Sequence, residues 1–134
     1  MKRTRLAKRS KSLRSRLIKD CDDIFREIIR RRDKMTCQRT GEKTNNLDVA
    51  HFHTRTINAT RWDEDNACLL KKGMHRFWAH VKHEEFRDFW IKRIGKDNFD
   101  RLKMKASYIH TTPTSQIKII KIALQIRSKE LCKN

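Results

Sequence analysis

The sequence lacks the cysteine patterns of a cross-linked or zinc-bound framework. Its four cysteines are scattered over 134 residues, and none belongs to a CxxC pair. This distribution favours reduced thiols over a disulfide framework or a zinc knuckle. We therefore expect a protein of the cytoplasm.

Long apolar segments are absent as well. No run approaches the roughly 18 consecutive apolar residues of a membrane-spanning helix, and the charged N-terminal segment is not followed by the apolar core of a secretory signal. We expect neither a membrane partner nor secretion.

Acidic residues are scarce relative to basic ones. The 16 Asp and Glu residues are outnumbered by 34 Lys and Arg residues, which gives a formal net charge of +18. Such an excess favours a polyanionic partner, because each Lys or Arg that meets a phosphate releases a condensed counterion. Nucleic acid is the expected partner. Two alternatives are compatible with the charge alone: a ribosomal-type RNA-binding protein and a basic protein whose charges are simply solvated.

The residue pattern divides the chain into four parts. Residues 1–16 are basic and contain no acid, which is typical of a flexible arm that orders on nucleic acid. Apolar residues at three- and four-residue spacing from Leu17 predict a basic amphipathic helix over 17–36. A mixed segment over 37–105 follows, and then a C-terminal loop and helix over 106–134.

The mixed segment predicts an α+β fold that is mostly helical overall. Alternating residues indicate a first strand, and a second strand ends before Gly73. Gly95 is a good C-cap for a later helix, and Ser115 is the expected cap of the last helix. The predicted strands span 47–52 and 67–70, and the predicted helices start at 75 and span 84–94, 97–105 and 115–131.

This arrangement brings suitable residue types for phosphodiester hydrolysis into one strand–loop–strand–helix unit. His51 falls at a strand end, Asn66 in the loop before the second strand and His75 at a helix start. Hydrolysis needs a positioned water, a base and positive charge near the leaving oxygen. One histidine suits the base, a second neutral imidazole suits a divalent metal, and an amide can ligate the metal or hold the loop.

Three motifs occur here in order: Ala-His-Phe at 50–52, Arg-Trp-Asp-Glu-Asp-Asn-Ala at 61–67 and His-Arg-Phe-Trp at 75–78. Together they resemble phage-type HNH (ββα-metal) nucleases, similar to the recombination protein NinG and the endonuclease VII group. The resemblance covers about residues 37–102 and makes 37–105 an HNH-like nuclease domain.

The resemblance implies a ββα-metal hairpin–helix motif embedded among several helices. It implies that His51 is the general base, that His75 is a metal ligand, and that Asn66 orders the loop or completes the metal environment. The cofactor would be one divalent ion, Mg²⁺ or Mn²⁺ first, with Zn²⁺ or Ni²⁺ as alternatives.

The chain departs from many relatives at the structural zinc. Those relatives hold a zinc with two CxxC pairs, of which only Cys37 is present here. No structural zinc is therefore predicted. We expect aromatic packing to hold the motif instead, through Phe77, Trp78, Phe86 and Trp90.

A second departure is Ala50, which stands where many HNH strands carry a metal-ligating Asp or His. Asp48 and His53 are candidate replacements. Each lies two residues from Ala50, so with regular strand pairing its side chain is on the same face of the strand as Ala50. His51 would then point to the opposite face unless the strand is bulged.

Basic residues near the motif are candidate DNA contacts. Arg55 and Arg61 have guanidinium groups that fit phosphate oxygens, although a solvated basic loop is the alternative. Arg30, Arg31 and Arg32 extend the basic face of the predicted helix 17–36.

Two further histidines, His80 and His83, are weaker candidate ligands. The five-residue step from His75 to His80 aligns poorly on a helix, where residues four apart share a face.

We therefore predict a metal-dependent HNH endonuclease that hydrolyses phosphodiester bonds in duplex or branched DNA. The resemblance suggests a role in phage DNA recombination or processing, in which case the cytoplasm is that of the host. A homodimer is left open. The alternative is a catalytically inactive DNA-binding protein that retains the HNH fold, which Ala50 favours.

Overall fold

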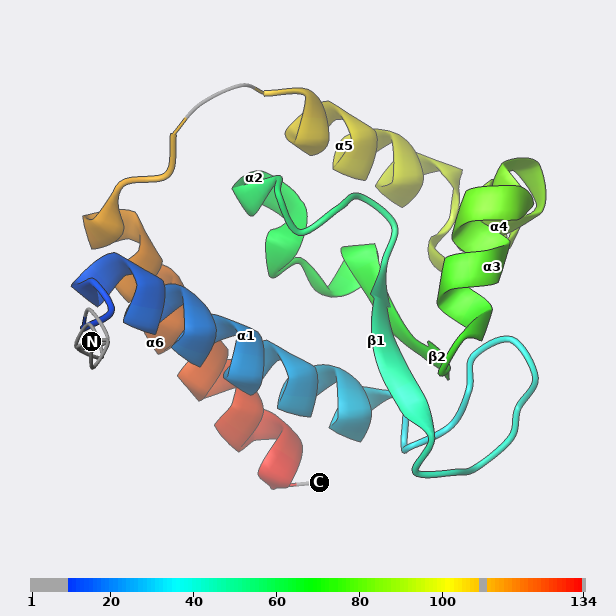
Figure 1. The fold of residues 1–134 in the computed structure, drawn as a ribbon, viewed down its shortest axis with the longest axis horizontal. Helices are drawn as coiled ribbons and strands as arrows, with labels where there is room; N and C mark the ends of the chain where they lie inside the picture. Colours follow the sequence, from blue (N-terminus) through cyan, green and yellow to red (C-terminus); the bar gives the residue numbers. More distant parts are fainter. Residues whose placement is uncertain (1–9, 109–110, 134) are drawn as a thin grey trace, which may run out of the picture.

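The computed structural model describes residues 10–108 and 111–133 and has a mostly helical α+β fold (Figure 1). Within this part of the chain, six α-helices accompany one two-stranded antiparallel hairpin, which is itself followed by helices. Residues 1–9 of the expected basic arm lie outside the described residues. In chain order the elements are α1 (Leu13–Arg32), β1 (Leu47–His51), α2 (Asn58–Arg61), the short 3-10 helix η1 (Glu64–Asn66), β2 (Ala67–Lys71), α3 (Met74–Val81), α4 (His83–Ile94), α5 (Lys96–Ser107) and α6 (Thr114–Cys132).

Helix α1 begins at Leu13, four residues earlier than its apolar pattern predicts. The Ser12 hydroxyl accepts a hydrogen bond from the Ser15 backbone N–H at 3.2 Å and caps the helix. Residues 13–16 of the expected arm therefore belong to the helix.

Helix α6 begins at Thr114, so Ser115 lies in its first turn and is not its cap. The carbonyl of Pro113 accepts hydrogen bonds from the N–H groups of Gln116 and Ile117 and starts the helix there. Gly95 ends α4 as predicted. No helix in the described part of the chain combines the length and apolarity needed to cross a membrane.

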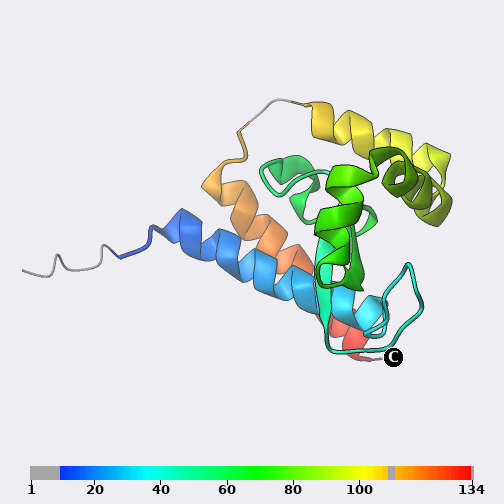
Figure 2. The ribbon, with the colours of Figure 1, turned by 45° about the vertical axis from the view of Figure 1, so that its right-hand side comes forward.

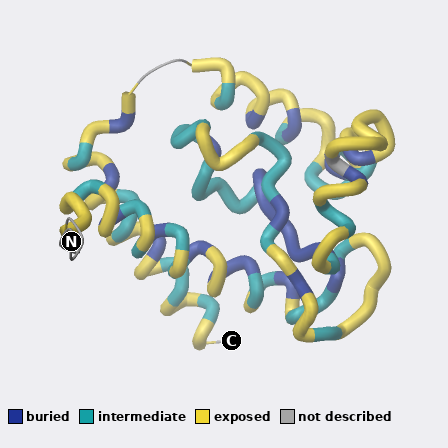
Figure 3. The backbone as a smooth tube through the Cα atoms, viewed as in Figure 1, coloured by how far each residue is buried: buried dark blue, intermediate teal, exposed yellow. Residues whose placement is uncertain are grey.

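Helices α1 and α6 lie side by side along one flank of the molecule, in both Figure 1 and Figure 2. The hairpin and the segment 52–66 lie between this pair and α5. Buried residues concentrate along the hairpin and on the inward sides of the helices (Figure 3). The hairpin is thus the scaffold against which both groups of helices pack.

An aromatic cluster holds α3 and α4 against the residue that follows β1. The Phe52 ring lies 5.5 Å from Phe86 and 5.6 Å from Trp90, and Trp78 meets Phe86 edge-on at 5.2 Å, measured between ring centroids. The expectation that Phe77 belongs to this cluster is wrong, because its side chain is 57% exposed. Neighbouring helix positions point about 100° apart, so burial of Trp78 turns Phe77 to solvent.

An ion pair at the end of α1 fastens this helix to β2. The buried carboxylate of Asp33 accepts hydrogen bonds from Arg32 Nε and from the Leu69 backbone N–H, both at 2.9 Å. Arg32 also donates to the carbonyls of Glu64 and Ala67, both at 2.6 Å. Arg32 is therefore occupied by the fold.

Replacing Asp33 by Ala removes the partner of a half-buried guanidinium and of a buried strand N–H. We expect Asp33→Ala to lower the free energy of unfolding by about 3 kcal/mol, measured by urea denaturation. Asp23→Ala is the matched control, since the Asp23 carboxylate is exposed and its partners among the described residues are the exposed Lys19 and Arg26. Equal losses of stability in the two variants would contradict the role given to Asp33.

Candidate functional site

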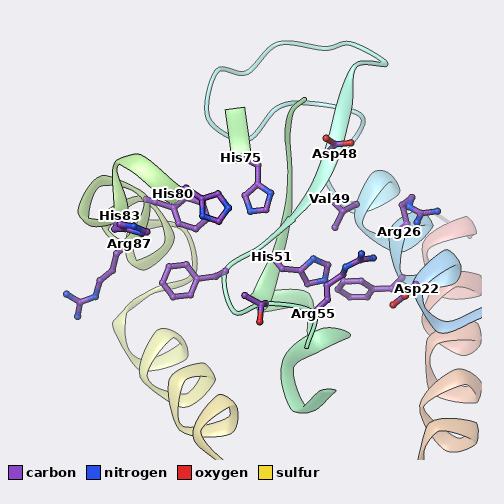
Figure 4. A pocket seen from close by; sticks show the side chains of 14 residues that line it. Asp22, Arg26, Asp48, Val49, His51, Arg55, His75, His80, His83 and Arg87 are labelled. Atoms are coloured by element: carbon purple, nitrogen blue, oxygen red, sulfur yellow. The ribbon is translucent and has the colours of Figure 1, made fainter. Parts of the chain in front are cut away.

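A cleft of about 780 Å³ runs along the open edge of β1, with α1 on one side and α3 and α4 on the other (Figure 4). The described residues place only β2 beside β1 in the hairpin, so the other edge of β1 is free. A cleft along a strand edge can receive side chains from both faces of that strand. Asp48 and His51 both line it, and His75 at the start of α3 joins them.

The ring of His51 is oriented by a backbone carbonyl. His51 Nε2 lies 3.0 Å from the carbonyl oxygen of Arg61. Because a carbonyl oxygen only accepts hydrogen bonds, Nε2 carries the proton and Nδ1 is the basic atom. Burial, with a smaller contribution from the charge of Arg55, lowers the pKa of His51 from its usual 6.5 to about 4. His51 is thus a neutral imidazole at pH 7, able to accept a proton at Nδ1.

Asp22 on α1 fixes the position of Arg61. The Asp22 carboxylate accepts hydrogen bonds from Arg61 Nη2 at 2.7 Å, from Arg61 Nε at 3.0 Å and from Trp62 Nε1 at 2.9 Å. Burial opposes ionisation of Asp22, but the hydrogen bonds from Arg61 and Trp62 outweigh it and hold its pKa below the ordinary value. Arg61 is therefore committed to Asp22, which does not favour the prediction that it clamps a phosphate.

His75 lies next to the backbone of His51 and within the field of Asp48. Burial lowers the pKa of His75, while the neighbouring His51 backbone and the Asp48 charge act in the opposite direction. The ring is thus neutral near pH 7, and a neutral imidazole is the form that binds metals.

Of the residues predicted as metal ligands, His75 and Asp48 line the cleft. Within the described ranges, no group of three or more His, Cys, Asp or Glu side chains is arranged around a common metal position. A closed zinc site with three or four protein ligands therefore does not fit. A Mg²⁺ ion fits better, because it uses few protein carboxylates and completes its shell with waters and substrate phosphates.

Asn66 lies outside the cleft and organises the backbone behind it. Its fully buried amide accepts a hydrogen bond from the His53 N–H at 2.8 Å and donates to the carbonyls of His53 and Thr60 at 3.0 and 2.9 Å. All three bonds join parts of the 52–66 segment. Asn66 is thus placed to order the loop, one of the two roles that the resemblance implies for it.

His53 also lies outside the cleft. Its ring packs edge-on against Phe52, with centroids 5.0 Å apart, and burial followed by the charge of Lys103 lowers its pKa. The structure does not bring it together with Asp48 and His75. Ala50 is fully buried opposite Cys68, so the position of the missing ligand faces the core.

The predicted DNA-binding arginines have different surroundings. Arg55 is exposed and lines the cleft. Arg31 is exposed and pairs with Glu27 at 3.1 Å, and Arg30 is half-buried. Neither of these two arginines lines the cleft. Arg32 is held by Asp33.

Sequence reasoning missed Asp22, Arg26 and Arg87, which also line the cleft. The helical period places Asp22 and Arg26 four residues apart on one face of α1, but nothing local indicates that this face meets the hairpin edge.

Comparison of the chain with protein-family models, with curated proteins and with solved structures gives no match.

The geometry around His51 predicts a specific titration. In ¹⁵N NMR spectra, the His51 imidazole should titrate near pH 4 and carry its proton on Nε2 at neutral pH. Because the unfolded chain takes up this proton near pH 6.5 and the folded chain only near pH 4, stability should fall as the pH decreases through this window. Because the Asp22 charge raises the His51 pKa, Asp22→Asn should lower this pKa further, whereas Asp23→Asn should leave it unchanged. A wild-type pKa between about 6 and 7, the range of an unperturbed imidazole, or a proton on Nδ1, would contradict the arrangement.

Proposed function

We propose that the protein is a metal-dependent endonuclease of the HNH (ββα-metal) type that hydrolyses phosphodiester bonds in DNA. The observation that carries the proposal is the convergence of His51, His75 and Asp48 in one cleft of a chain with net charge +18. These residues come from the first strand of the hairpin and the start of the helix that follows it, which is the order in which the resembling nucleases carry them. The biological setting that the resemblance suggests is phage DNA recombination or processing.

In this mechanism, His51 is the general base. Its Nδ1 accepts the proton of the water that attacks the phosphorus atom, while Nε2–H stays hydrogen-bonded to the Arg61 carbonyl. Since the His51 pKa is about 4, the base is already deprotonated at working pH. The resulting imidazolium is stabilised by the carbonyl of Arg61, as in other sites where a histidine is oriented from behind.

Asp48 and His75 are the residues that would hold the metal ion. A bound divalent ion would stabilise the negative charge that develops on the phosphate and the leaving 3′ oxygen. Asp48 supplies an oxygen ligand of the kind Mg²⁺ prefers, and the neutral ring of His75 also suits Mn²⁺.

The surroundings of the cleft suit a polyanionic substrate. Arg26 on α1 and Arg55 after β1 both line it and both are exposed. Positive side chains that meet phosphates supply much of the affinity of proteins for DNA. Arg26 and Arg55 would hold the strand on the side of the cleft next to His51.

The second candidate is a DNA-binding protein without nuclease activity. The observation that favours it is the absence, among the described residues, of a third His, Cys, Asp or Glu donor beside Asp48 and His75. An RNA-binding protein is the third possibility that net charge permits.

A cleavage assay separates these possibilities. We expect the wild type, with Mg²⁺ or Mn²⁺, to cut plasmid or branched DNA, and EDTA to stop the reaction. His51→Ala should slow single-turnover cleavage about 10²- to 10⁴-fold, since a general base contributes that much, while DNA affinity stays nearly unchanged. His53→Ala is the matched control, because His53 is the neighbouring histidine outside the cleft.

The proposal fails if the wild type binds DNA but leaves duplex, single-stranded and branched forms intact with either ion. That result supports the inactive DNA-binding protein. Stronger binding to RNA than to DNA at two salt concentrations would support the third possibility.

A further inference from the structure

We propose that the α3–α4 wall of the cleft is a phosphate-binding subsite, formed by His80, His83 and Arg87, for a second phosphodiester of the bound strand. The inference rests on the proposed nuclease function and deepens it. It assigns to these three side chains a role in holding the strand beyond the scissile bond.

The subsite depends on a break between two helices. Helix α3 ends at Val81 and α4 begins at His83, with the non-helical Lys82 between them (φ −119°, ψ 62°). This break lets the last turn of α3 and the first turn of α4 face the same cleft. His80 and His83 therefore line one wall, although they belong to different helices. Arg87 follows His83 by one helical turn and lines the same wall.

The three side chains lie in succession along this wall. In Figure 4, His75, His80 and His83 follow one another away from His51, and the Arg87 side chain extends farther outward. The Arg87 guanidinium lies over the Phe99 ring, 5.7 Å from its centroid, a contact that helps to place it at the outer end. The row therefore leads from the proposed reaction centre to the rim of the cleft.

The fold does not use these side chains in polar contacts. His80, His83 and Arg87 are exposed, and none forms a hydrogen bond or ion pair with another described residue within the usual distance limits. Arg32 and Arg61, in contrast, are held by Asp33 and Asp22. Three imidazole or guanidinium groups aligned on one cleft wall thus remain available to a ligand.

The chemistry of the wall selects an anion. The described acidic side chains that line the cleft are Asp22 and Asp48, on α1 and β1, so no carboxylate lines the α3–α4 wall. Imidazole N–H and guanidinium groups are donors that suit phosphate oxygens. A DNA strand presents one phosphate about every 3.4 Å along the duplex axis, so a strand with its scissile bond near His51 would bring neighbouring phosphates to this row.

The test measures binding without cleavage, with Ca²⁺ in place of Mg²⁺. The variants are Arg87→Ala and the double variant His80→Ala/His83→Ala, and Lys92→Ala is the control because this exposed α4 residue does not line the cleft. Circular dichroism checks that each variant folds. We expect the slope of log K against log salt concentration to become shallower by about 0.9 for each phosphate that the variant no longer neutralises.

A second measurement locates the bound phosphate. Single neutral methylphosphonates are placed in turn along one strand of an otherwise normal duplex. For the wild type, one substitution to one side of the cut should weaken binding roughly tenfold, and the same substitution should have little further effect in Arg87→Ala or in the double variant.

The subsite proposal is overturned if both variants keep the salt slope of the Lys92→Ala control and the full methylphosphonate effect. Because binding is measured without cleavage, this outcome is independent of whether the wild type cuts DNA. A wild type that binds with the predicted slopes and never cuts would overturn the nuclease function and leave the subsite standing.

Discussion

The carboxylate of Asp22 joins three parts of the molecule that are far apart in the sequence. It lies on α1, it binds the side chains of Arg61 and Trp62 at the end of α2, and through Arg61 it sets the carbonyl that orients His51. The side chains of Asp22 and Arg61 are each only 17% exposed, so neither charge is well solvated without the other. Removing one partner of such an ion pair leaves a poorly solvated charge, which is strongly destabilising. The pair therefore holds α1 and the end of α2 in a fixed relative position.

Asn66 fixes the same segment by joining its last residue to His53 near its start. Its amide pairs with both backbone groups of His53, two residues after His51, and with the Thr60 carbonyl. The 52–66 segment, which contains α2 and η1, is thus held near its ends by Asn66 and at Arg61 and Trp62 by Asp22. The contacts of Asp22 and Asn66, together with the aromatic cluster around Phe52, determine the shape of the cleft. A base needs such a fixed environment, because proton transfer depends on the direction of one lone pair.

The elements of the fold were largely predictable because their signals are local. Alternation revealed the strands, three- and four-residue spacing revealed the helices, and Gly95 marked the end of α4. Helix starts were less predictable, since Ser12 and Pro113 act through hydrogen bonds that the apolar pattern does not contain. The exposure of Phe77 followed from which face of α3 meets the core, a tertiary property.

The candidate site was predictable in part. His51 and His75 followed from residue types and spacing, and Asp48 was a replacement for the ligand that the resemblance expects at Ala50. Strand alternation predicted that Asp48 and His51 would diverge, yet both line the cleft because it runs along the free edge of β1. The role of Arg61 could not be inferred from the sequence, since it depends on a carboxylate 39 residues away. The alternation rule does not apply to His53, because β1 ends at His51.

A crystal structure of the His51→Ala protein with an uncleaved DNA duplex and Ca²⁺ would test the proposed site most directly. We predict a phosphodiester between the position of His51 and His75, with the ion bound by Asp48 and His75 and by oxygens of that phosphate. DNA bound across another face, with the β1 edge open to solvent and no ion beside Asp48, would contradict this prediction.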